Sequence, residues 1–275
     1  MTSDGALHPR SSGGAARDLA QMVRWWRGLV AEPVLSVLFP PRCVGCRDFE
    51  THLCAPCRET LTEMGENGCP RCGEPGPRPL VGGRCSHCMG ADLGFAGARS
   101  AFRHQGVARR LVAEFKSGGQ PVLGRLMADL ARPAFAGYAS SIGSREQVLV
   151  TWVPSHRAVQ RERGYNQAEV LARALAGDPK VLPSAGLVRK TAATKHQKGL
   201  GRVGRQGNLR GVFTLDERAV AGLSSGCQTL LLVDDVYTTG ATAREVSSVL
   251  AAGTGLPVHV FTFSRVVAGA AEGHD

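Results

Sequence analysis

The sequence predicts an α/β fold in which helices flank a central parallel sheet, preceded by a small zinc-binding module. Two observations indicate this fold class. After residue 95, apolar runs typical of strands alternate with segments of helical periodicity, as expected of a parallel sheet covered by helices. Before residue 90, eight of the nine cysteines form a regular pattern. The 275 residues are 43% hydrophobic and 20% charged, which excludes wholesale disorder.

The segment before the cysteines divides into a tail and a helix. Residues 1–17 are small and polar, which predicts a disordered tail without the charged-then-apolar order of a signal peptide. Residues 18–39 carry apolar side chains at helical spacing from Asp18 to Val30, so we expect an amphipathic helix there. No run approaches the roughly 20 apolar residues of a membrane span. We therefore expect a cytoplasmic protein.

Residues 40–90 hold four C-x-x-C pairs and form the expected zinc-ribbon module. Each pair places two thiolates on one side of a tight turn, at a spacing that suits tetrahedral Zn²⁺. The expected ligands are Cys43, Cys46, Cys54, Cys57, Cys69, Cys72, Cys85 and Cys88. They would hold one or two ions. Four thiolates around an ion leave no position open for catalysis, so the zinc is expected to be structural.

The cysteine pattern leaves some details open. Disulfides are disfavoured because no secretion signal is visible, and a redox C-x-x-C normally occurs singly. Sequential pairing of the knuckles would give two ribbons, whereas crossed pairing would give one interleaved module. His52 or His87 could each replace a thiolate. Cys227 stands apart before an apolar run and is expected to be a small buried side chain.

The expected body spans residues 95–268 and is followed by a tail at 269–275. A hinge is expected before it, at Ala91–Gly97. The expected helices are Val107–Ser117, Leu123–Ala131, Asn166–Ala176 and Gly240–Ala252. Pro133 is expected to stop the second of these helices. The expected strands are Gln147–Val153, Gln228–Val233 and Pro257–Phe263.

The most informative stretch, Leu230 to Thr242, reads LLLVDDVYTTGAT. A buried strand ends in two carboxylates, and a turn of small hydroxyl residues leads into a helix. Ligands of parallel sheets bind at the carboxyl ends of strands, and a helix N-terminus attracts phosphate. Carboxylates would repel the phosphate but suit the vicinal hydroxyls of a ribose. The stretch therefore predicts a 5-phosphoribosyl site, with Asp234 and Asp235 on the hydroxyls. The phosphate would lie against Thr238, Thr239, Gly240, Ala241 and Thr242.

The net charge of +10 is concentrated in one segment of the chain. Residues 157–210 hold twelve Lys or Arg residues against three acidic residues, a balance of +9. Such a segment usually faces phosphates, in nucleic acid or in a small metabolite. The alternative is a solvated basic face that only aids solubility.

Several motifs resemble known families. VDDVYTTGAT resembles the phosphoribosyl-pyrophosphate signature of type I phosphoribosyltransferases. It is accompanied by LFPPRC, AFRHQGVARRLVAEFKSGG, VPSHRAVQRERGYNQAEVLA and RKTAATKHQKGLGRVGRQGNLRGVF. Together the motifs resemble the ComF (ComFC) competence-protein family, from Leu35 to Val266 and in the family's order. The resemblance implies a type I phosphoribosyltransferase-like sheet behind a double zinc ribbon.

The same resemblance implies further contact residues. A pyrophosphate loop would follow the strand Gln147–Val153, and a mobile flap would lie within residues 195–205. The implied residues of the loop and the flap are Ser155, His156, Arg157, Arg161, Arg163, Lys195 and Gln197. Lys116 matches a lysine of the family, whereas His104 stands where a tyrosine is expected. Plainer interpretations are a lysine that favours a helix dipole, arginines in surface ion pairs, and a loose basic loop.

In activity, the resemblance implies binding of phosphoribosyl pyrophosphate with Mg²⁺ and a link to DNA uptake in natural transformation. Transfer of phosphoribosyl to an unknown acceptor would release pyrophosphate. Single-stranded DNA and a competence helicase or other uptake machinery are implied partners. The alternative is a single-stranded DNA-binding competence protein whose sugar-phosphate pocket is a non-catalytic sensor. No residue is identified as a general base, so the sequence does not decide between enzyme and sensor.

Overall fold

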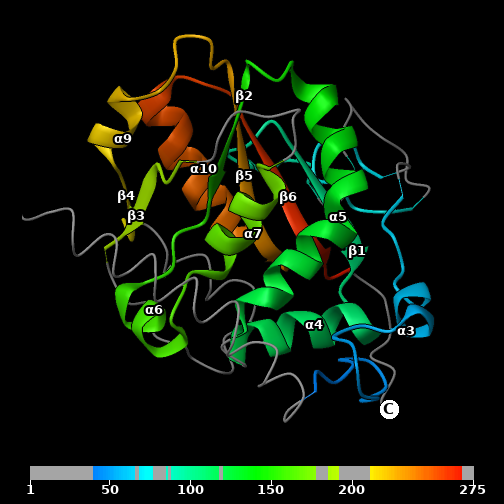
Figure 1. Ribbon diagram of the computed structural model, residues 1–275. Coiled ribbons are helices and arrows are strands. Elements are labelled where there is room, and N and C mark those ends of the chain that lie inside the picture. Colours follow the sequence, from blue (N-terminus) through cyan, green and yellow to red (C-terminus); the bar gives the residue numbers. More distant parts are fainter. Residues whose placement is uncertain are drawn as a thin grey trace, which may run out of the picture. The chain divides into compact units, whose positions relative to one another are not determined.

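The computed structural model describes residues 40–65, 68–76, 85, 88–117, 120–177, 185–191 and 211–267 (Figure 1). The expected helix within residues 18–39, the two tails, and the flap residues Lys195 and Gln197 lie outside the described residues. The chain divides into two compact units, residues 1–54 and 55–275. The second pair of cysteine knuckles therefore folds together with the body.

A four-stranded parallel sheet forms the centre of the larger unit. Its strands are β1 (Gly97–Arg103), β2 (Val148–Trp152), β5 (Thr229–Tyr237) and β6 (Val258–Arg265). The strand order is β1-β6-β5-β2, and all neighbours run parallel. The middle strands β5 and β6 are buried along almost their whole length, as apolar runs of a covered parallel sheet should be. The carboxyl ends of all four strands meet at one edge.

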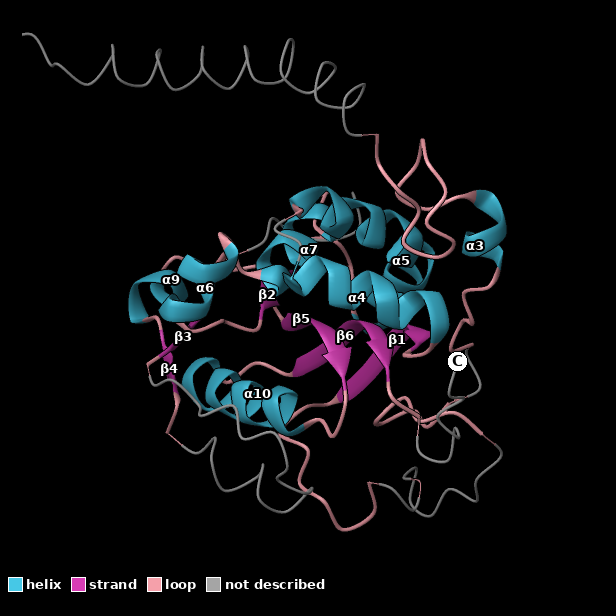
Figure 2. Cartoon of the chain, turned by 90° about the horizontal axis from the view of Figure 1, so that it is seen from below, coloured by secondary structure: helices cyan, strands magenta, loops and turns pink. Residues whose placement is uncertain are grey.

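Helices cover both faces of this sheet. Figure 2 shows α10 (Ala241–Thr254) on one face and α4 (Gly106–Ser117), α5 (Pro121–Ile142) and α7 (Gln167–Leu175) on the other. Each helix buries one apolar stripe, because residues three or four positions apart share a helix face. The predicted fold class is confirmed, with a parallel sheet flanked by helices and an N-terminal cysteine module.

Shorter elements surround the sheet. They are α3 (Ala55–Glu59), α6 (Arg157–Arg163), α9 (Glu217–Ala221) and the antiparallel strands β3 (Val188–Lys190) and β4 (Phe213–Leu215). Both strands of this small pair contact α10. Among the described helices, none combines the length and the apolar character needed to cross a bilayer.

Helix α5 corrects one prediction, because it runs through Pro133 instead of ending before it. A proline inside a helix removes one backbone hydrogen bond. Beyond it, however, Phe135, Tyr138 and Ala139 are buried. Burial of this second half of the helix outweighs the lost hydrogen bond.

Strand β1 was not predicted, since its amino end was assigned to a hinge. Arg99 and Arg103 interrupt its apolar pattern. In the structure the strand pairs with β6 over its length, and Nη1 of Arg99 donates hydrogen bonds to the carbonyl oxygens of Pro70 and Ala98. Partners distant in the chain therefore make this strand possible.

Candidate functional site

The eight predicted zinc ligands form two groups of four. The first cysteine group is Cys43, Cys46, Cys54 and Cys57, and the second cysteine group is Cys69, Cys72, Cys85 and Cys88. Within each group, the ligand atoms all lie within 4.8 Å of one another. The knuckles therefore pair sequentially. No histidine of the described residues joins either group.

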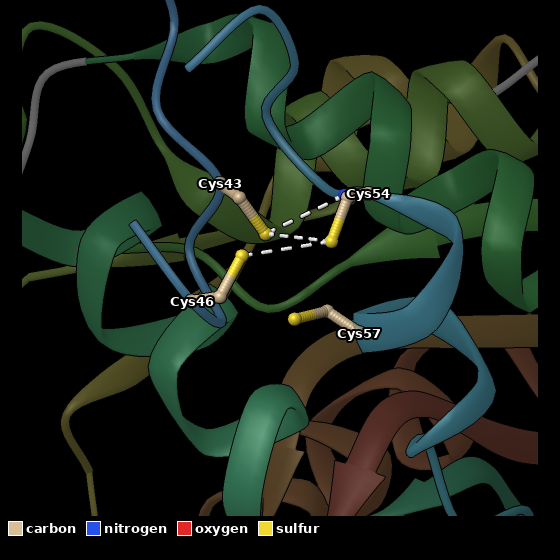
Figure 3. A group of neighbouring side chains, drawn as sticks. All are labelled: Cys43, Cys46, Cys54 and Cys57. Atoms are coloured by element: carbon tan, nitrogen blue, oxygen red, sulfur yellow. Dashed lines mark hydrogen bonds between the residues drawn. The ribbon is translucent and has the colours of Figure 1, made fainter. Parts of the chain in front are cut away.

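The sulfur separations fit tetrahedral zinc. With Zn–S bonds of about 2.3 Å, tetrahedral thiolates stand roughly 3.8 Å apart. Figure 3 shows the sulfur atoms of the first group directed toward one another, and Sγ of Cys54 lies 3.5 Å from that of Cys43 and 3.6 Å from that of Cys46. In the second group, the separation is 3.7 Å between Cys69 and Cys88. Both groups therefore support structural Zn²⁺.

The second group is the more enclosed of the two. All four of its cysteines are buried, whereas Cys46 of the first group is exposed. Burial raises the pKa of the Cys69 thiol, but hydrogen bonds from backbone N–H groups of the knuckles outweigh this effect and lower the pKa to about 6. Such a thiol is ionised at neutral pH, which is the form that binds metal.

A hollow lies at the carboxyl end of β5, where the predicted sugar-phosphate loop begins. Its lining residues are Asp234, Val236, Tyr237, Thr238, Gly240, Ala241, Thr242, Ala243 and Thr262. The hollow is open to solvent, and the space in it that no atom fills, open solvent included, is about 240 Å³. Such an open hollow could hold only part of a ligand, and the remainder would lie at the surface.

The turn after β5 brings backbone N–H groups to this hollow. Gly240 is the N-cap of α10 and has a left-handed backbone, with a φ of 74°. A Cβ at this position would collide with the ring of Tyr237, so the turn needs glycine. Oγ1 of Thr239 accepts a hydrogen bond from the N–H of Ala241 at 3.4 Å, which stabilises the turn. The first N–H groups of a helix lack partners within it, and they attract anions.

The two predicted carboxylates lie in different surroundings. The sequence predicts a strand that ends at Val233, but β5 continues to Tyr237, and successive strand residues point to opposite sides. Asp234 lines the hollow. Asp235 is only 7% exposed, and its carboxylate lies 3.1 Å from Nζ of Lys116. The structure thus separates the two acids, and Asp234 is the one that faces the hollow.

Asp234 has an unusual proton affinity. Burial of its carboxyl group and the neighbouring charge of Asp235 raise its pKa to about 7. The positive charges of Lys116 and Lys190 act in the opposite direction. Near neutral pH the carboxyl group is therefore partly protonated. Perturbed groups of this kind in a hollow are candidates for function.

The predicted pyrophosphate loop follows β2, the neighbour of β5 in the sheet. Oγ of Ser155 and Nε2 of Gln167 are buried without a hydrogen-bond partner in the described structure. Buried polar atoms rarely lack partners, so these two atoms have unused capacity for a ligand. Asn166 instead has a structural role, since it caps α7 and donates a hydrogen bond to the carbonyl oxygen of Val153 at 3.1 Å.

The predicted arginines of this region lie on α6. Arg157 and Arg161 are exposed, and Nη1 of Arg163 donates to Oε1 of Gln167 at 3.3 Å. Nδ1 of His156 accepts a hydrogen bond from the N–H of Ala158 at 3.2 Å and thereby caps the helix. The start of α6 therefore adds positive charge to the carboxyl edge of the sheet.

Two ionisable residues near this edge are not predicted as site residues. Nδ1 of His104 lies 2.9 Å from Oγ of Ser264, and burial together with the charge of Lys116 lowers its pKa. Burial also lowers the pKa of Lys190, against the attraction of Asp234. The sequence offers one weak signal for each residue. His104 departs from the family pattern, and Lys190 lies five residues before the first residue of the expected flap.

These features define the class of the protein as an α/β chain with a parallel sheet and structural zinc-ribbon clusters. The double zinc ribbon domain family matches residues 34–89. Over 76% of the chain and 90% of the relative, the sequence is 26% identical to competence protein F of Haemophilus influenzae.

Two other relatives have similar names and coverage. The DNA utilization protein YhgH of Salmonella typhimurium is 25% identical, over 78% of this chain and 91% of the relative. Competence protein ComFC of Bacillus subtilis is 24% identical, over 78% of this chain and 84% of the relative. The resemblance to the ComF family is confirmed by these homologues.

Proposed function

We propose that this chain binds phosphoribosyl pyrophosphate with Mg²⁺ at the carboxyl edge of its sheet and serves in DNA uptake. The observation that carries the proposal is the hollow at the start of α10, where Asp234 lies beside a turn rich in backbone N–H groups. The turn offers donors for the 5-phosphate, and Asp234 offers an acceptor for a ribose hydroxyl. The names of the relatives, competence and DNA utilization proteins, support the role in DNA uptake.

The diphosphate of the ligand would lie over the loop after β2. Val153 donates its N–H to the carbonyl oxygen of Val233, so this loop starts directly beside Asp234. The unpaired Oγ of Ser155 and Nε2 of Gln167 supply donors, and Arg157 supplies positive charge. Mg²⁺ would bridge the phosphate oxygens, as this ion prefers oxygen ligands and retains waters.

Transfer to an acceptor would follow from such binding. The bond between the anomeric carbon and the diphosphate oxygen would break with its electron pair on pyrophosphate, while a bond to the acceptor forms on the other face. The groups of this chain would act by positioning the ligand and by stabilising charge on pyrophosphate. The reduced thiolates of the two cysteine groups fit a reducing compartment, so the proposal includes a cytoplasmic location.

Isothermal titration with phosphoribosyl pyrophosphate and Mg²⁺ tests the binding. We expect wild type to bind and Asp234→Asn to bind about tenfold more weakly, since a hydrogen bond to a charged group contributes roughly 1.5–3 kcal/mol. Asp129→Asn removes an equal charge from an exposed position on α5 and is the matched control. The proposal would be refuted if wild type gave no binding heat and if pyrophosphate displaced no bound phosphoribosyl pyrophosphate from it.

Single-stranded DNA is a second candidate ligand, and a separate observation, a set of exposed arginines, supports it. Helices α4 and α6 start at the carboxyl ends of β1 and β2, and Arg109, Arg110, Arg157 and Arg161 on them are exposed. Phosphate contacts make affinity fall steeply with salt. Fluorescence anisotropy with a labelled oligonucleotide should therefore give a linear fall of log affinity with log salt. No affinity at about 0.1 M salt would exclude this ligand.

A further inference from the structure

Arg265, the last residue of β6, anchors the knuckle of the second cysteine group to the sheet. Its Nη1 donates to the carbonyl oxygen of Cys72 at 2.5 Å. Its Nε and Nη2 donate to one carboxylate oxygen of Glu74, at 3.0 and 2.7 Å. Arg265 and Glu74 are each 1% exposed. A buried cation is stable only while its acceptors stay in place, so the position of Arg265 depends on the knuckle.

The same guanidinium group packs on Tyr237, the last residue of β5. Its central carbon lies 4.1 Å from the centroid of the tyrosine ring. The two residues are partners in the β5–β6 register, and the N–H of Val266 donates to the carbonyl oxygen of Tyr237 at 3.0 Å. Phe95 contacts the ring edge-on, with centroids 6.4 Å apart. Because Tyr237 is only 4% exposed, its ring has little freedom to move.

The ring of Tyr237 in turn supports the threonine loop, residues 238–242. The atoms nearest to a Cβ placed on Gly240 are the hydroxyl oxygen and two ring carbon atoms of Tyr237. The left-handed Gly240 therefore lies directly against the ring, at the first turn of α10. A displacement of the ring would change the conformation of the loop.

We propose that the second cysteine group, when it holds zinc, positions the threonine loop through Arg265 and Tyr237. Loss of the metal releases the knuckle, so the carbonyl oxygen of Cys72 and the carboxylate of Glu74 no longer hold fixed positions. Arg265 then needs other acceptors or water, because an unpaired buried charge is costly. Tyr237 loses a packing surface, and the loop loses its support. Arg265 and Tyr237 are thus positioning residues. The identity of the loop's ligand, phosphoribosyl pyrophosphate, rests on the proposed function.

This link also works in the reverse direction, because coupling between two sites is reciprocal. A ligand that holds the threonine loop in place stabilises the ring of Tyr237 and, through Arg265, the knuckle. Binding of phosphoribosyl pyrophosphate should therefore raise the affinity of the second group for zinc. Couplings between two sites in proteins typically change affinities by about 5- to 150-fold.

Hydrogen–deuterium exchange of the full chain tests the link without any ligand. Cys72→Ser removes one ligand of the second group, and Cys46→Ser, the matched control, removes one ligand of the first. We expect the amides of Arg244 and Val266, which donate to the carbonyl oxygens of Gly240 and Tyr237, to exchange at least about fivefold faster in Cys72→Ser and at an unchanged rate in Cys46→Ser. Arg265→Lys keeps the charge but not the forked hydrogen bonds. It should accelerate exchange of these two amides, while zinc analysis should find both metal sites still occupied.

The outcomes separate this link from the proposed function. Exchange of the Arg244 and Val266 amides that is the same in wild type, Cys72→Ser and Arg265→Lys would overturn the link. Should Cys72→Ser fail to fold, Arg265→Lys alone decides it. Where wild type binds phosphoribosyl pyrophosphate, both variants should bind at least about fivefold more weakly, and unchanged affinity would also overturn the link. Where wild type does not bind, the proposed function fails and the exchange data still decide the link.

Discussion

Asp234 and Gly240 form the hollow for different physical reasons. Asp234 places a carboxyl group of raised pKa at the end of a buried strand. Gly240 allows a left-handed turn against the ring of Tyr237, where a side chain would collide. Asp234 therefore supplies an ionisable group, and Gly240 allows the backbone conformation of the turn. Substituting one of them at a time separates these two contributions.

Replacing Gly240 with alanine should destabilise the fold. The change adds a Cβ to a left-handed residue and forces it against the ring of Tyr237, so we expect a loss above the roughly 1 kcal/mol of the backbone strain alone. Gly255→Ala is the control, because Gly255 has a similar φ of 70° but no atom within 4 Å of an added Cβ. Urea unfolding measures both. Equal losses in the two variants would argue against the contact with Tyr237.

The pKa of Asp234 predicts a pH-dependent effect of Asp234→Asn on stability. The folded-state pKa of about 7 is above the ordinary 3.8, so wild type loses stability as pH rises through this range. The asparagine variant avoids this loss. Its melting temperature should therefore exceed that of wild type by a margin that grows from pH 5 to pH 8 and then levels off. A margin that is constant or shrinks with pH would contradict the raised pKa.

The secondary-structure elements show how packing overrides local signals. Strand β5 extends past the predicted end at Val233 because β6 pairs with it up to Tyr237. Helix α5 continues through Pro133 because its second half is buried. In both elements a partner distant in the sequence supplies free energy that the local sequence pattern does not show.

Pro133→Ala should stabilise α5. The proline is exposed, and alanine would restore the missing N–H donor without a new contact. A helix-interior proline costs about 3 kcal/mol relative to alanine, partly offset by the smaller entropy of an unfolded chain that contains proline. We expect a net gain of about 1–2 kcal/mol in the free energy of unfolding, measured by urea denaturation. A decrease would show that the helix depends on the proline at this point.

At the scale of the whole molecule, the second cysteine group lies entirely within the larger unit. The chain divides after Cys54, and residues 68–76 pack within the larger unit, where Arg265 holds the knuckle. The second group therefore contributes to the body as well as to the zinc module. Its loss should affect the larger unit more than the loss of the first group, in which only Cys43 is buried.

Zinc content provides the corresponding prediction. The purified chain should hold two zinc ions, measured by atomic absorption, because two groups of four cysteines have the required spacing. Cys43→Ser should reduce the content to one ion. Cys227→Ala should retain both, since Cys227 lies outside the two groups. Retention of both ions in Cys43→Ser would contradict the assignment of ligands.

Sequence alone predicted the cysteines of the two groups, the apolar strands and the turn after β5. These features depend on residues that are neighbours in the chain, such as Cys69 and Cys72, or on regular spacing, so their geometry is local. The same reasoning predicted the parallel sheet and the similarity to the ComF family. It also named Asp234, whose position at the carboxyl end of β5 follows from the strand itself.

Only the tertiary structure decided which cysteines group together, where Asp235 points and what lies beneath Gly240. Lys116 is 119 positions from Asp235 in sequence yet forms an ion pair with it, and Arg265 reaches back to Cys72. Such contacts depend on how the strands and helices are arranged in space. Strand pairing and side-chain burial together decide that arrangement. Periodicity and spacing carry no information on them, because they describe residues along one element at a time.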